Sequence, residues 1–180
     1  MARKRDDKEE SIRVVGFYLA NEEYGVEISQ IQSIERLPDI ITEMPQAPLF
    51  VEGVIEYRGK VIPLIDLRKR LSLPVEHSDE IGAETYFKET KVIVVSTQEK
   101  LIGFIVNNVS DVLTIPTSTI SVPPPEVVNV DNIRSLGKGR ITSRVRKKGE
   151  EVINERMIIL LDLEKIIKSQ ELKNWHVEKP

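Results

Sequence analysis

Apolar and polar residues alternate in short runs along most of the chain, and a period of two residues predicts β-strands. Two such runs, 13–19 and 24–29, flank a short polar turn and together predict a β-hairpin. Further hairpins are predicted over 50–67 and 92–106. Pro63 lies inside one of these strands, where its missing N–H predicts an edge position or a bulge.

The two ends of the chain differ from this pattern. Residues 1–12 are almost all polar and predict a flexible tail, and 171–180 are expected to form a C-terminal tail. Before that, a strand is predicted over 157–163, followed by a helix whose start Asp162 caps. No apolar run approaches the roughly 18 residues of a membrane span. The charged N-terminus also predicts no secretory signal.

The chain contains an internal repeat. A shift of 78 residues preserves glycines, β-branched residues and strand-ending prolines, as in the pairs Gly25–Gly103, Ile31–Val109, Ile34–Val112 and Pro38–Pro116. A shift of 96 places IPLIDL at 62–67 on IILLDL at 158–163. The second half therefore has about 18 extra residues. The charged segment 140–155 is expected to be this insertion, as a solvated loop.

The repeat predicts one domain, 13–170, made of two similar halves at about 13–75 and 88–167. Two short all-β halves favour small barrels of five or six strands, because closure removes exposed edges. An exchange of strands between the halves is the alternative arrangement. A junction between two barrels is also where a concave binding site is expected.

The composition limits the chemistry. Cysteine is absent, which excludes disulfides and thiolate ligands and favours a reducing compartment. His77 and His176 lie in polar segments and are expected to be solvated. No metal-ligand cluster, nucleophile elbow or phosphate loop is present, so we expect no catalytic residue, no metal and no cofactor. Asp66 and Asp162 occupy equivalent strand ends and are interpreted as caps.

A basic segment from Arg140 to Lys148 raises the hypothesis of a β-barrel nucleic-acid-binding protein. It has no interleaved aromatic residue on which bases could stack. Glu150, Glu151 and Glu155 follow, and the whole chain has a net charge of −3. A solvated surface is therefore favoured over a nucleic-acid interface.

Four segments together resemble the CheW family of bacterial chemotaxis coupling proteins: YGVEISQIQSIERLPDI, PLFVEGVIEYRGKVIPLIDLRKRL, IGFIVNNVSDVL and ERMIILLDLEKII. The resemblance extends from about Arg13 to Ile167. It implies two five-stranded SH3-like β-barrel subdomains with short helices and a C-terminal helix, and no enzymatic activity.

The resemblance also implies partners. Members link chemoreceptor cytoplasmic tips to the regulatory domain of the chemotaxis histidine kinase, in the cytoplasm at membrane-associated receptor arrays and without membrane insertion. An adaptor of a related kinase system for surface motility is the alternative. The kinase-binding residues are left unassigned. The positions that match the family's receptor-binding surface are Ile31, Ser33, Gly53, Arg58, Val109 and Val112.

The chain departs from the family's usual residues at a few positions. Ser33 stands where glutamate is common, and Glu56-Tyr57 replace an asparagine-leucine pair before Arg58-Gly59. Ser135 replaces a common glycine. These departures bear on partner choice more than on the fold.

Overall fold

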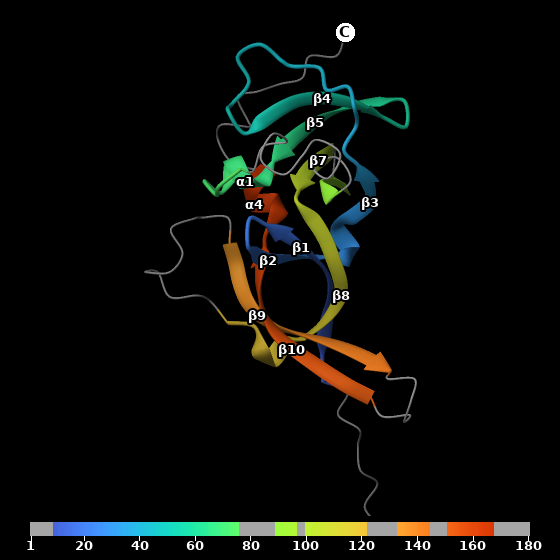
Figure 1. The fold of residues 1–180 in the computed structure, drawn as a ribbon, viewed down its shortest axis with the longest axis vertical. Coiled ribbons are helices and arrows are strands. Elements are labelled where there is room, and N and C mark those ends of the chain that lie inside the picture. The colour runs from blue at the N-terminus through green and yellow to red at the C-terminus, as the bar shows by residue number, and fades with distance from the viewer. Residues whose placement is uncertain (1–8, 76–88, 97–99, 122–132, 145–150, 168–180) are drawn as a thin grey trace, which may run out of the picture.

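The computed structural model describes residues 9–75, 89–96, 100–121, 133–144 and 151–167. Among these residues the strands form two five-stranded sheets, and the two short α-helices lie between the sheets (Figure 1). The predicted all-β class with short helices is therefore confirmed. The expectations for His77, for His176 and for a tail over 171–180 lie outside the described residues.

The first sheet closes into a barrel with the strand order β1-β2-β10-β9-β8, which we call the first barrel. Its strands are β1 (Ser11–Leu19), β2 (Glu22–Glu27), β8 (Asn108–Pro116), β9 (Ile133–Arg144) and β10 (Glu151–Leu161). The first predicted hairpin is the β1–β2 pair, with Val15 opposite Val26. The predicted tail over 1–12 is too long, because Ile12 pairs with Ile115 and packs on apolar side chains inside the barrel.

The second sheet has the order β3-β6-β7-β5-β4. Its strands are β3 (Ile31–Arg36), β4 (Val51–Tyr57), β5 (Lys60–Asp66), β6 (Lys91–Ser96) and β7 (Leu101–Val106). The hairpins predicted over 50–67 and 92–106 are the β4–β5 and β6–β7 pairs. Its edge strands meet through a hydrogen bond of 2.8 Å between Ser33 Oγ and Tyr57 Oη. A side-chain contact thus joins these edges, whereas backbone pairing closes the first barrel.

Each sheet takes strands from both halves of the repeat. Strands β1 and β2 pair with β8–β10, whereas β6 and β7 pair with β3–β5. The parallel pairings that join the halves are equivalent: Gly25 lies opposite Leu160, and Gly103 opposite Leu64. A Cβ atom would come within 3.3 Å of Leu160 at Gly25 and within 3.0 Å of Leu64 at Gly103. A side chain at either glycine would therefore crowd the leucine opposite it, so both crossings are close.

Of the two places expected for Pro63, an edge strand or a bulge, the structure contradicts the edge strand. Strand β5 is interior, with β7 on one side and β4 on the other, so the edge position is wrong. Parallel pairing with β7 begins one residue later, at Leu64. On the other side Pro63 faces Val54, whose N–H and C=O both bond to Thr42. Neither neighbour needs the N–H that proline lacks, so the strand tolerates it.

The segment 140–155 also differs from the expected insertion loop. Strand β9 continues to Arg144, β10 begins at Glu151, and these two residues lie opposite each other in the register. The physical reason is a β-branched content that favours strands, from Ile141, Thr142, Val152 and Ile153. The extra residues lengthen a hairpin, drawn in orange at the lower right of Figure 1.

The short helices begin at the two predicted caps. Asp66 precedes α1 (Leu67–Arg70), and its Oδ1 accepts the Arg68 N–H at 2.9 Å. Asp162 precedes α4 (Leu163–Ile167), and its Oδ1 accepts the Lys165 N–H at 3.3 Å. The interpretation of both aspartates as caps is confirmed. Two 3₁₀ turns, η1 (Ile28–Gln30) and η2 (Thr117–Thr119), precede β3 and follow β8.

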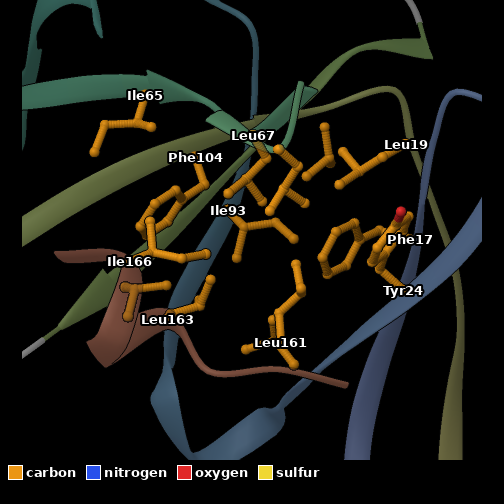
Figure 2. Packing of buried hydrophobic residues seen from close by; sticks show 14 of the residues in the cluster. Phe17, Leu19, Tyr24, Ile65, Leu67, Ile93, Phe104, Leu161, Leu163 and Ile166 are labelled. Carbon is orange, nitrogen blue, oxygen red and sulfur yellow. The ribbon is translucent and has the colours of Figure 1, made fainter. Parts of the chain in front are cut away.

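The largest apolar cluster of described side chains lies between the two sheets, and we call it the shared core. Figure 2 shows Phe17 and Tyr24 of the first barrel beside Ile93 and Phe104 of the second sheet. Phe17 and Tyr24 stack with ring centroids 6.3 Å apart. Burial of each such side chain stabilises the fold by roughly 1.5–3 kcal/mol. The two sheets are therefore joined by the same residues that stabilise each of them.

Each sheet also has a smaller core of its own. Val14, Leu113 and Ile158 belong to the core of the first barrel. Leu64 and Val92 belong to the core of the second sheet. Since 78 residues separate Val14 from Val92, the repeat places equivalent residues at equivalent depths. The two sheets are therefore related scaffolds with equivalent interiors.

Candidate partner-binding surface

The six candidate positions are divided between the two sheets. Ile31 and Ser33 lie on β3, Gly53 on β4, and Arg58 in the turn between β4 and β5, all in the second sheet. Val109 and Val112 lie on β8 of the first barrel. The structure links Ser33 to the residue before Arg58, and it packs Ile31 and Val109 against the shared core.

Arg58 occupies a tight two-residue turn. Its φ is +49° and that of Gly59 is +75°, the left-handed pair that matches the twist of a hairpin. No atom lies within 4 Å of where a Gly59 Cβ would be, so glycine is required by conformation rather than by space. The Arg58 side chain is exposed, and its guanidinium carbon lies 5.0 Å from the centroid of the Tyr57 ring. The backbone of this turn therefore presents a solvent-accessible cation at a defined place.

Gly53 has a structural role. It is buried with φ +145°, and a Cβ atom there would overlap the carbonyl oxygen of Thr42. At the next residue, Val54 and Thr42 exchange two backbone hydrogen bonds of 2.8 and 3.0 Å. Gly53 thus lets the chain before β4 cross that strand closely, which covers its outer edge.

The three apolar candidates, taken together with the repeat partner of Val112, form an inner and an outer pair. Ile31 and its repeat partner Val109 are half-buried and pack against the shared core. Val112 is 45% exposed and its repeat partner Ile34 is 40% exposed. A partner could contact the outer pair without disturbing the core, whereas a change at Ile31 or Val109 also alters packing.

The sequence did not single out a polar cluster on the first barrel. Glu23 Oε1 accepts hydrogen bonds from Ser110 Oγ at 2.6 Å and from Arg156 Nη2 at 2.8 Å. Arg156 also forms an ion pair with Asp111 at 3.2 Å. The Glu23 side chain is 8% exposed, and its hydrogen bond raises the pKa of Arg156 above its ordinary value. No sequence signal relates these residues, because 133 positions separate Glu23 from Arg156.

The described residues offer little that could hold a metal ion or cross a membrane. In the described part of the chain, no group of three or more His, Asp or Glu side chains could hold a metal ion. Burial and a hydrogen bond to Glu22 raise the pKa of the Tyr24 phenol, so this buried tyrosine stays protonated. None of the described helices is long and apolar enough to cross a membrane.

The basic segment is only partly described. Arg140 and Arg144 lie on β9, and β9 pairs with β10 throughout that stretch. The remaining basic residues, Arg146, Lys147 and Lys148, lie outside the described residues.

Two linked five-stranded sheets around one shared core define the class of this protein as an all-β domain built from two related halves. The comparisons with known proteins give the particular family. The CheW-like domain family matches residues 13–171, and the chain belongs to this family.

Relatives of known name are similar to this chain over most of its length. The chemotaxis protein CheW of Klebsiella aerogenes is 33% identical over 156 residues, which cover 87% of this chain and 81% of the relative. That of Helicobacter pylori is 30% identical over 165 residues, 92% of this chain and 87% of the relative. The crystal structure of the scaffolding protein TtCheW from Thermoanaerobacter tengcongensis is similar with a TM-score of 0.68 and 28% identity. It covers 90% of this chain and 96% of that one, and the predicted SH3-like fold is thereby confirmed.

Proposed function

We propose that this chain is a non-enzymatic chemotaxis coupling protein. It links the cytoplasmic tips of chemoreceptors to the regulatory domain of the chemotaxis histidine kinase and so lets receptors control the kinase. The observation that carries the proposal is membership of the CheW family over residues 13–171. Relatives named chemotaxis protein CheW and a structure titled as a scaffolding protein support it.

The proposed receptor contact is centred on Arg58. A charged side chain on a fixed turn can bond to a carboxylate or to free backbone carbonyls of a receptor helix. Val112 is an exposed apolar residue, and Ile31 and Val109 are half-buried against the shared core. Such residues suit a helix that lays an apolar face on a β-sheet protein. The location follows from these partners: cytoplasmic, at membrane-associated receptor arrays.

The proposal includes the absence of turnover. The sequence has no phosphate loop and no nucleophile elbow, so the isolated chain should neither hydrolyse ATP nor transfer phosphate. Activity that persists through purification and disappears with one point substitution would contradict a pure scaffold.

The test is a kinase assay with receptor-containing membranes, performed with and without this chain. The expected result is that receptors change the rate of kinase phosphorylation only when the chain is present. Arg58→Ala serves as a matched variant and should couple the two more weakly. Equal kinase rates with and without the wild-type chain, at saturating concentration, would overturn the proposal.

A further inference from the structure

Two departures from the family's usual residues meet in the structure. Ser33 and Tyr57 were notable separately in the sequence, on segments 24 positions apart. In the structure Ser33 Oγ and Tyr57 Oη share a hydrogen bond of 2.8 Å that joins the two edge strands of the second sheet. The tyrosine ring is 7% exposed and belongs to the core of that sheet. Tyr57 is therefore held at its ring by packing and at its hydroxyl by Ser33.

Arg58 is placed on this anchored ring. It is a non-glycine residue at φ +49°, a conformation that disfavours most side chains. Its guanidinium carbon lies 5.0 Å from the Tyr57 ring centroid, within the range of a cation–π contact. A long side chain that is already confined loses less conformational entropy when a partner binds.

We propose that Tyr57 is a positioning residue, which holds the Arg58 guanidinium ready for the receptor and is itself fixed by Ser33. The inference rests on the proposed function, since it assigns Arg58 to the receptor contact. The partner group that this cation would meet is an acceptor, either a carboxylate or a helix carbonyl. Ser33 and Tyr57 act through Arg58 and need not touch the receptor.

The first measurement needs no receptor. In the full chain, the NMR signals of the Arg58 side chain should carry a ring-current shift from Tyr57. The shift should vanish in Tyr57→Leu. It should weaken to a similar, partial extent in Tyr57→Phe and Ser33→Ala, because each variant keeps the ring and removes the hydrogen bond that fixes it. If the wild-type signals match those of Tyr57→Leu, Arg58 is not held on the ring and the inference is overturned.

The second measurement is a double-mutant cycle with a receptor-tip fragment that binds the wild-type chain. Tyr57→Leu should weaken binding by about two- to five-fold, as for loss of an exposed cation–π contact. Tyr57→Phe and Ser33→Ala should each weaken it by less than about two-fold. In an Arg58→Ala background, Tyr57→Leu should have almost no further effect, because the residue through which it acts is gone.

The outcomes distinguish the inference from the function on which it rests. If Tyr57→Leu costs the same affinity with and without Arg58, Tyr57 acts through the fold and the inference is wrong while the receptor contact stands. If Arg58→Ala leaves receptor affinity unchanged, the proposed contact itself is wrong and the positioning role falls with it. If Tyr57→Leu fails to fold, the wild-type NMR measurement still decides, because Arg58 side-chain signals at the positions of an unstructured, exposed arginine would overturn the inference.

Discussion

The first barrel and the second sheet use the same strand pattern but different chemistry at equivalent positions. In the first barrel, Glu23 bonds to Ser110 and Arg156. A Cβ atom at Gly16 would overlap Ser110 Oγ, so this glycine leaves room for the polar group. In the second sheet a shift of 78 places Leu101 at the position of Glu23 and Val94 at that of Gly16.

The difference shows what duplication preserves. Leu101 packs against the core of the second sheet and Val94 is buried within it. Lys60, which a shift of 96 makes equivalent to Arg156, is exposed. The backbone pairing is thus common to both sheets, whereas the polar contacts that join Glu23 to Ser110 and Arg156 in the first have no counterpart at the equivalent positions of the second. In the second sheet, Arg58 is an exposed cation in the turn between β4 and β5.

The largest expected effect comes from comparing the two helix caps. Asp66 and Arg68 are both buried and form a bidentate pair, with contacts of 2.9 and 2.6 Å. Asp66→Ala should lower the free energy of unfolding by about 3–5 kcal/mol, because it leaves a buried arginine without its carboxylate. Its repeat equivalent, Asp162→Ala, is the matched control and should cost about 1 kcal/mol as a lost cap. Urea unfolding measures both, and equal losses would contradict the assignment.

The next effect compares two glycines of the second sheet that differ in the space around them. Gly53→Ala should destabilise the chain by about 2–4 kcal/mol, since it adds backbone strain and an overlap with Thr42. Gly59→Ala, at φ +75° but in open space, should cost only about 1–2 kcal/mol. Thermal unfolding of the two variants makes the comparison. A tolerated Gly53→Ala would mean that the crossing at Thr42 can shift.

A smaller effect tests the charge network of the first barrel. Glu23→Leu should lower the free energy of unfolding by about 1–3 kcal/mol, because Arg156 and Ser110 lose their shared acceptor. Adding Arg156→Lys gives the first barrel the same two residue types as the equivalent positions of the second sheet, Leu101 and Lys60. This second change should restore part of the lost stability. Chemical denaturation of both variants measures this. If Glu23→Leu alone is more stable than the wild type, the contacts of Glu23 with Ser110 and Arg156 destabilise the fold.

The smallest effect is expected at the long hairpin. Replacing residues 142–154 with a short Gly-Ser linker should change stability by less than about 1 kcal/mol. The pairing of β9 with β10 closer to the barrel, including Met157 opposite Lys138, remains available. A loss above about 2 kcal/mol would show that the segment packs on the rest of the chain. Unchanged stability with lost kinase binding would identify it as a partner contact.

Local pattern predicted much of the fold. Alternation located the hairpins, because side chains on a half-buried strand face water and core in turn. The repeat identified Gly25 with Gly103, which the structure places at equivalent crossings. Asp66 and Asp162 were predictable as caps because a strand end followed by a helix needs an acceptor there.

Long-range features were not predictable in the same way. Nothing local relates Glu23 to Arg156, because their contact depends on β2 and β10 pairing across the exchange. The edge position of Pro63 was wrong because both neighbouring strands happen to need no bond at that residue. Residues 140–155 were expected to form a loop because of their many charges, although their β-branched residues favour strands. Of the candidate site, Arg58 could be named from its turn, but its contact with Tyr57 required the structure.

The most direct test of the account is a titration of wild type and Arg58→Ala against two partners separately, a receptor-tip fragment and the kinase regulatory domain. Because the substituted side chain is exposed, both proteins should melt at nearly the same temperature. We predict that Arg58→Ala weakens receptor binding by about 1–3 kcal/mol, as for a charge-assisted hydrogen bond, with kinase affinity unchanged. Unchanged receptor affinity would remove Arg58 from the site, and lost kinase affinity in its place would show that the two faces are exchanged.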